Sequence, residues 1–164
     1  MSKTAPKATS PRRLKLGILR ENLGYLTRIT RSVVTQSSGE FVDDLGYATG
    51  QITLLGLIAA NDGVSQNDLA RALLMRKSQV TGLIHDLVER GLVTRTEMGS
   101  DRRFNAMALT KAGALAWRQA RDRITRHSNT VLKGLDAGER EQLMQLMRKV
   151  IAANLADGDL DFDF

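Results

Sequence analysis

A cluster of short polar and basic side chains lies in the middle of the chain, and a pair of arginines follows further along. The cluster comprises Arg76, Lys77, Ser78, Gln79 and Thr81. Glutamine can pair bidentately with adenine, serine and threonine can bond to either base type, and lysine can reach guanine or a phosphate. The arginine pair, Arg102 and Arg103, suits phosphate and a narrow minor groove. These residue types favour contact with duplex nucleic acid, although a solvated helix face would explain the cluster taken alone.

Two helices separated by a tight turn are predicted to position this cluster. Ser65 and Asp68 have the spacing of a capping box, so a helix begins there. The predicted inward face of this helix is Leu69, Leu73 and Leu74. A second helix is predicted near residues 76–89, because apolar residues recur there with the period of one helix face: Val80, Leu83, Ile84, Leu87 and Val88. Gly91 fits the end of that helix, since glycine adopts a positive φ without a Cβ clash.

A β-hairpin with a basic tip is predicted after the second helix. Residues 92–96 and 104–109 suit strands, and Gly99-Ser100-Asp101 is a turn signal between them. The tip projects the arginine pair, and Arg95 lies on the first strand. Asp101 suits bracing an arginine through a charge-assisted hydrogen bond better than contacting an anion. The pattern predicts a winged helix-turn-helix in a chain that is mainly α with a small β-hairpin wing.

The segments before this region are helical by pattern. Ser10-Pro11 predicts the start of a helix of about 25 residues, with serine as N-cap and proline at the first helical position. Its nearly heptad seam consists of Leu16, Leu19, Leu23, Leu26 and Val33. A loop is predicted over residues 36–50 from their Gly, Ser and Asp content. Thr49 is predicted to open the next helix and Gly63 to end it.

Two further helices are predicted after the hairpin. Thr110 can cap a long helix that runs to about residue 132, and Gly134 breaks it. Asp136 and Glu139 form another capping-box spacing at the start of the last helix. The apolar face of that helix consists of Leu143, Met144, Leu146, Met147, Val150, Ile151 and Leu155.

The first and last helices carry more apolar surface than a small winged core can cover. They could pack on each other within one chain, but we favour a homodimer in which the helices of two chains interlock, because such faces would form an exposed patch in a monomer. The predicted organisation is a flexible basic tail at 1–9, a dimerisation helix and loop at 10–48, the DNA-binding domain at 49–110, linker and dimerisation helices at 111–155, and an acidic tail at 156–164.

The composition narrows the function classes. The 164-residue chain has a net charge of +6. Because the charges of its basic and acidic ends cancel, this excess lies on residues 14–156. A basic body favours a polyanionic partner.

Cysteine is absent, which excludes a thiol-based sensor. The chain has only two histidines, which argues against a metal site, so no cofactor is expected. We find no phosphate loop, nucleophile motif or paired acid–base cluster, and therefore predict no enzyme. No apolar run suits a bilayer span or a signal peptide, which favours a cytoplasmic location.

The sequence resembles the MarR family of bacterial winged-helix transcription regulators over about residues 12–155. The similarity rests on Leu69-Ala70, VTGLIHDLVERGLVTR at 80–95, Asp101 and Arg103 in the predicted wing, and LTKAG at 109–113. The resemblance implies a homodimer that binds double-stranded DNA at an inverted-repeat operator. The family commonly has a Ser, Thr or Asp at the cap of the second helix, where this chain has Arg76. Because arginine cannot accept a hydrogen bond, that helix needs another capping partner.

A small organic effector is expected by elimination, and the resemblance suggests a crevice between the dimerisation lobe and the winged lobe as its site. Residues with suitable chemistry are Tyr25, Arg28, Trp117, Arg118 and Arg121. An aromatic ring beside guanidinium groups suits an aromatic acid or its conjugate, although Trp117 could equally serve packing. The sequence therefore predicts a dimeric, sequence-specific transcription regulator, a repressor released by such a ligand. The alternative is a winged-helix architectural or protein-interaction module without ligand response.

Overall fold

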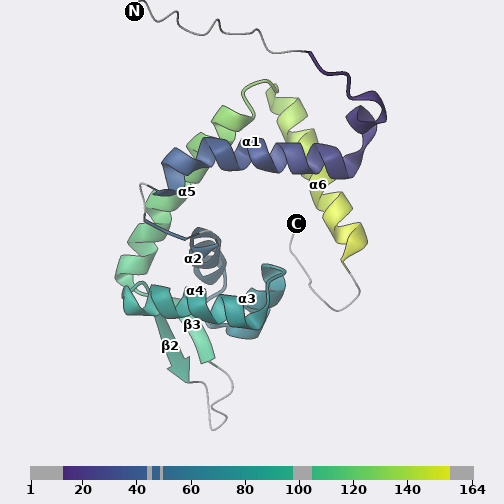
Figure 1. Ribbon diagram of the computed structural model, residues 1–164. Coiled ribbons are helices and arrows are strands. Elements are labelled where there is room, and N and C mark those ends of the chain that lie inside the picture. The colour runs from purple at the N-terminus through teal and green to yellow at the C-terminus, as the bar shows by residue number, and fades with distance from the viewer. Residues whose placement is uncertain (1–12, 44–45, 49, 98–104, 156–164) are drawn as a thin grey trace, which may run out of the picture. The chain divides into compact units, whose positions relative to one another are not determined.

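The computed structural model describes residues 13–43, 46–48, 50–97 and 105–155 (Figure 1). The predicted hairpin tip and both charged end segments fall outside these residues. The chain divides into two compact units, Met1–Gln36 and Ser37–Phe164.

The first unit contains a 3-10 helix, η1 (Gly17–Glu21), and most of α1 (Leu23–Asp43). Gly17 has a φ of 55°, and Asn22 is extended between the two helices. The Asn22 Oδ1 atom accepts a hydrogen bond from the Tyr25 backbone N–H at 2.8 Å. The prediction of one unbroken helix starting at Ser10 is therefore wrong, because Asn22 caps a separate helix. The prediction of a loop from residue 36 is also wrong, because α1 continues to Asp43.

The second unit contains the helix-turn-helix around a buried core. Helices α2 (Gln51–Ala60), α3 (Gln66–Ala72) and α4 (Lys77–Glu89) pack together, and Figure 1 shows α2 between α4 and α5 (Lys111–Val131). The largest fully buried apolar side chains come from all three helices and the sheet: Leu54, Leu55, Ile58, Leu69, Val80, Ile84, Leu87, Val93 and Met107. The predicted inward stripe of the second helix is confirmed, since Val80, Ile84 and Leu87 are fully buried.

A three-stranded antiparallel sheet closes one side of this core. Its order is β1 (Val64–Ser65), β3 (Asn105–Leu109), β2 (Val93–Glu97). The predicted hairpin pairs Val93 with Leu109 and Arg95 with Met107. The sequence pattern does not predict strand β1, because two residues are too few to show the alternation that identifies a strand.

The end of α4 and the start of α5 are joined by a compact set of hydrogen bonds. Gly91 has a φ of 67°, and its N–H donates to the Val88 carbonyl while that of Leu92 donates to Leu87, as expected for a glycine helix stop. The Thr110 hydroxyl donates to the Gly91 carbonyl at 2.7 Å and accepts from the Gly113 N–H at 2.9 Å. The predicted cap at Thr110 is confirmed, and it also fastens α5 to the end of α4.

Two predictions at helix ends are wrong. The helical pattern assigns Leu74 to the inward face of α3, but Leu74 lies in the α3–α4 turn with a φ of 50° and is 74% exposed. The pattern also assigns Thr49, outside the described residues, as the cap of α2, whereas the N-cap is Gly50 with a φ of 94°. In both cases the helical pattern extends beyond the residue at which the helix begins or ends.

The last helix, α6 (Ala137–Asn154), begins as predicted. The Asp136 side chain accepts from the Glu139 N–H and the Glu139 side chain accepts from the Asp136 N–H, both at 2.9 Å. Several of its apolar side chains are 37–54% exposed: Met144, Leu146, Met147, Val150 and Ile151. Among the described helices, none combines the length and apolar character needed to cross a membrane.

Candidate nucleic-acid interface

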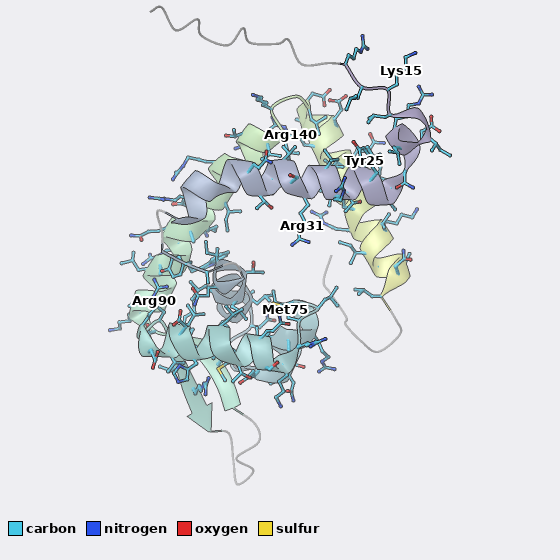
Figure 2. The ribbon with its side chains drawn as sticks, in the orientation of Figure 1. Lys15, Tyr25, Arg31, Met75, Arg90 and Arg140 are labelled. Atoms are coloured by element: carbon cyan, nitrogen blue, oxygen red, sulfur yellow. The ribbon has the colours of Figure 1, made fainter. Side chains whose placement is uncertain are left out.

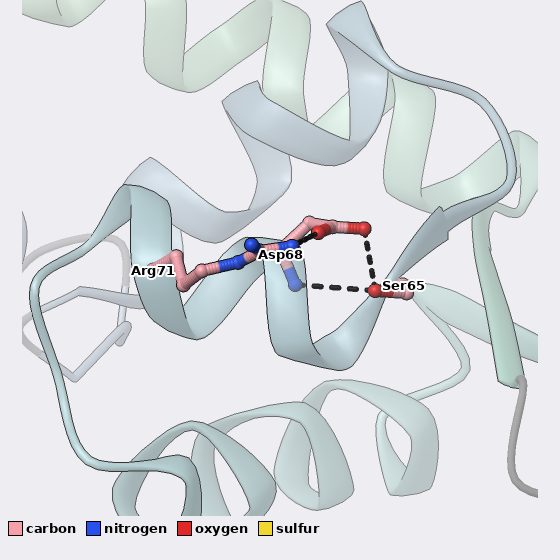
Figure 3. A network of polar contacts seen from close by, with 3 residues as sticks. All are labelled: Ser65, Asp68 and Arg71. Atoms are coloured by element: carbon pink, nitrogen blue, oxygen red, sulfur yellow. Dashed lines mark hydrogen bonds and ion pairs between the residues drawn. The ribbon is translucent and has the colours of Figure 1, made fainter. Parts of the chain in front are cut away.

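The first helix of the helix-turn-helix is anchored by a polar network at its start (Figure 3). The Ser65 Oγ atom accepts from the Asp68 backbone N–H at 3.1 Å and donates to Asp68 Oδ2 at 2.5 Å. The Arg71 guanidinium forms an ion pair with the other carboxylate oxygen of Asp68. The Ser65 hydroxyl, with Arg71, holds the pKa of Asp68 below its ordinary value of 3.8. The predicted cap is confirmed, and its carboxylate is stabilised in the ionised form.

Asp68→Asn is expected to remove part of the acid sensitivity of folding. Because the folded pKa is lowered, the carboxylate stabilises the folded state above the pKa of the unfolded chain, and this contribution is lost as the pH falls through the folded pKa. Urea unfolding at about pH 6 and about pH 3 measures the difference, which should be larger for the wild type than for the variant. Asp62→Asn is a control for the loss of one exposed carboxylate. Equal pH dependence in wild type and Asp68→Asn would contradict this account.

The start of α4 presents the polar cluster to solvent. Arg76, Lys77, Ser78, Gln79 and Thr81 are all exposed. The positive end of the helix dipole adds to the two cationic side chains, so an anion such as a phosphate is favoured here. Figure 2 labels the side chains just beyond the two ends of this helix, Met75 and Arg90.

Gln79 forms one half of a capping box at the start of α4, and among the described residues no side chain accepts from the free N–H groups of the first turn there. The Gln79 Oε1 atom accepts from the Arg76 backbone N–H at 3.1 Å. The Gln79 N–H itself donates to the Arg76 backbone carbonyl at 3.0 Å, so the backbone provides the acceptor that the arginine side chain cannot. Replacing Gln79 by alanine would remove this bond as well as any contact to a base.

Thr81 is held by a residue that the sequence pattern does not single out. Its hydroxyl donates to the Lys77 carbonyl at 2.8 Å and accepts from Gln66 Nε2 of α3. Gln66 thus braces α3 against α4 beside the polar cluster. No local signal identifies this pair, because the two residues are far apart in the sequence and glutamine is common on solvated faces.

The hairpin places one predicted contact residue and leaves three outside the described residues. Arg95 is exposed on β2, opposite Met107 of β3. Asp101, Arg102 and Arg103 lie in the part that the structure does not describe, so their roles stay predictions. Among the described residues, no group of acidic or histidine side chains is arranged to hold a metal ion.

Comparison with known proteins agrees with this architecture. The MarR family model matches residues 43–103. A curated protein of Thauera aromatica, described as a putative transcriptional regulatory protein for the hcr operon, is 29% identical over 105 residues, which are 64% of this chain and 63% of that protein. The solved structure of the transcriptional repressor CouR, bound to a 23-mer DNA duplex, is 28% identical with a TM-score of 0.78, and the match covers 85% of this chain and 99% of that one. Over residues 43–103 the chain therefore resembles the MarR family of regulators.

A second curated protein matches over the same number of residues. The uncharacterised HTH-type transcriptional regulator YdgJ of Bacillus subtilis is 25% identical over 105 residues, covering 64% of each protein. The chain thus spans less than two thirds of the length of these curated relatives. The predicted fold class, a mainly α winged helix-turn-helix, is confirmed. Both relatives are described as transcriptional regulators, in agreement with the prediction that this chain is not an enzyme.

The residues predicted to hold an effector occur in both units of the chain. Tyr25 and Arg28 lie on α1, where the Arg28 guanidinium is 5.8 Å from the centroid of the Tyr25 ring. Trp117 lies on α5, half-buried against the core, and a Cβ atom built at Gly56 of α2 would lie 2.8 Å from its Cη2 atom. Arg118 and Arg121 are exposed, and Arg121 is 3.7 Å from Asp122. Trp117 therefore has a packing role, and an effector site here stays a prediction.

Proposed function

We propose that this chain is a DNA-binding transcription regulator of the MarR type. The observation that carries the proposal is the exposed, cationic start of α4 on a helix-turn-helix core similar to that of a repressor solved on a DNA duplex. In this proposal α4 enters the major groove, where Ser78 and Gln79 meet base edges and Lys77 meets phosphate. Arg76 and Thr81 complete this contact surface.

The wing contacts the neighbouring minor groove in the same proposal. Arg95, Arg102 and Arg103 neutralise phosphate or enter the groove, and Asp101 braces one of the arginines. The matching Asp101 and Arg103 of the family resemblance support this assignment.

The regulator acts as a homodimer on an inverted repeat in this proposal. The exposed apolar side chains of α6 support it, because a monomeric protein rarely leaves so many at neighbouring positions uncovered. Half-site centres are then about 10 bp apart, so that two copies of α4 enter successive major grooves on one face. Sedimentation at micromolar concentration distinguishes a dimer from a monomer.

An organic effector, an aromatic acid or its conjugate, releases the DNA in this proposal. The absence of cysteine and the presence of arginines near Trp117 support a small organic molecule. The effector must bind the DNA-incompetent state more tightly, since equal affinity for both states shifts nothing. The alternative, an architectural winged-helix module, predicts neither release nor a preferred duplex. A specific reader prefers its selected site over unrelated DNA by roughly a thousandfold or more.

Lys77→Ala tests the placement of α4. The wild type is used to select duplexes from a random-sequence library, and affinities for the selected duplex and a scrambled duplex are measured by fluorescence anisotropy over a salt series. Because Lys77 is assigned to phosphate, its loss should weaken both duplexes alike and reduce the salt slope by about one unit. Lys133→Ala, which removes the same charge in the turn after α5, should leave the slope unchanged. A loss confined to the selected duplex would move Lys77 from phosphate to a base.

A further inference from the structure

The short connection before α2 is fastened to α4 through a buried amide. Gln51 is 1% exposed and is the buried polar side chain of the described core. Its Oε1 atom accepts from the Ala48 backbone N–H at 2.8 Å, and its Nε2 atom donates to Asp86 Oδ2 of α4 at 2.7 Å. Both ends of the amide are therefore satisfied, and one of its bonds is to a charged acceptor, which strengthens it.

Arg90, just after the end of α4, makes a second set of contacts with this connection. The Arg90 Nη1 atom donates to the Gly46 carbonyl at 3.0 Å, and the Arg90 guanidinium carbon lies 4.3 Å from the centroid of the Tyr47 ring (Arg90 is labelled in Figure 2). A guanidinium at this distance from a tyrosine ring is attracted to it. Residues 46–48 thus contact α4 directly through Arg90 and indirectly through Gln51.

These contacts act on α4 differently from its apolar stripe. Val80, Ile84 and Leu87 pack through non-directional contacts, which resist separation of the helices but tolerate a small rotation of α4 about its axis. A hydrogen bond weakens when its angle changes, so the Gln51–Asp86 bond fixes that rotation. The start of α2 is also close to α4, since a Cβ at Gly50 would lie 3.3 Å from Leu83 Cδ1.

The Asp86 carboxylate already has a partner within the protein, the Gln51 amide. The carboxylate would be repelled by phosphate, yet Asp86 lies on the helix that carries the exposed polar cluster. Its bond to Gln51 gives the residue a function within the protein instead.

We propose that Gln51 and Asp86 are positioning residues that set the rotation of α4, and hence its ability to distinguish base sequences, without touching DNA. Arg90, through Gly46 and Tyr47, holds the same connection in place. This inference rests on the proposed DNA-binding function. It predicts that breaking the pair lowers discrimination between duplexes while general attraction to DNA, which depends on the surface cations, is retained.

The test reverses the polarity of the pair. Gln51→Glu places a second carboxylate beside Asp86, whereas Asp86→Asn alone keeps an oxygen that accepts from Gln51. In the double variant, the introduced carboxylate accepts from both the Ala48 N–H and the amide introduced on α4, so the bonding pattern is restored with donor and acceptor exchanged. Discrimination is the ratio of affinities for the duplex selected by the wild type and a scrambled duplex of the same composition.

Gln51→Glu is expected to reduce discrimination about tenfold, close to the loss of one base contact, with an unchanged salt slope. Asp86→Asn should stay near the wild type, and the double variant should recover most of the ratio. Gln51→Met, which keeps the volume and removes both hydrogen bonds, should also lose discrimination while its melting temperature confirms a folded protein. If Gln51→Glu does not fold, Gln51→Met still tests whether the hydrogen bonds of Gln51 are needed for discrimination.

Two results would overturn the inference: unchanged discrimination in folded Gln51→Met, or no recovery in the double variant relative to a folded Gln51→Glu. A wild type that selects no duplex would instead overturn the proposed DNA-binding function. The two failures are therefore distinguishable in one set of titrations.

Discussion

Gly113→Ala is expected to destabilise the protein by roughly 3 kcal/mol or more, at the upper end of the cost of overpacking a core. A Cβ atom at this position would lie 1.9 Å from the Leu92 carbonyl oxygen. The obstacle is backbone, so no side-chain rotation relieves it. The start of α5 would have to move away from the end of α4, which would also stretch the bonds of Thr110 to Gly91 and Gly113. Urea unfolding, with the free energy extrapolated to water, measures the loss.

Gly82→Ala is the matched control for this substitution. Gly82 lies inside α4, is exposed, and has nothing within 4 Å of the position of an added Cβ. Alanine is favoured over glycine within a helix by about 0.5–1 kcal/mol, so this variant should be more stable than the wild type. The same chemical change should thus have opposite signs at the two positions. A Gly113→Ala protein as stable as the wild type would show that α5 is not held against the Leu92 backbone.

The elements that could be predicted from the sequence are those with local signals at their ends. The caps at Ser65, Thr110 and Asp136 and the stop at Gly91 each involve residues a few positions apart, and all four are present. The stripe of α4 is predictable for the same reason, since its period repeats within one helix. Interactions between residues a few positions apart determine these helix ends and faces, so they can be predicted without knowing the surrounding fold.

The sequence-based predictions are wrong or incomplete where two helical patterns adjoin, or where hydrogen-bond partners are distant in the sequence. The helical pattern before Asn22 joins two separate helices, and the polar residues after Val34 conceal the continuation of α1. The Gln66–Thr81 and Gln51–Asp86 bonds depend on how α2, α3 and α4 pack, which no single segment encodes. The exposed polar start of α4 was therefore predictable, whereas the hydrogen bonds that hold this helix in place were not.

Trp117→Ala is expected to destabilise the protein by about 3 kcal/mol, the lower end of the range for aromatic truncation because the indole is half-buried. The indole packs on the core and against the α2 backbone at Gly56. Trp117→Phe should lose less, because an aromatic ring remains between α5 and α2. Urea unfolding of both variants measures the difference.

A double-mutant cycle with Gly56→Ala tests whether the indole and the α2 backbone are in direct contact. In the wild type the added methyl group would approach three indole carbons at 2.8–3.2 Å, so Gly56→Ala should be destabilising. Once Trp117 is alanine that clash is gone, the methyl group fills part of the cavity, and alanine is the better helix former. Gly56→Ala should therefore change sign and stabilise the Trp117→Ala protein. Additive effects would mean that the two residues do not touch, and Trp117 would then be free to serve an effector rather than the packing of α5 on α2.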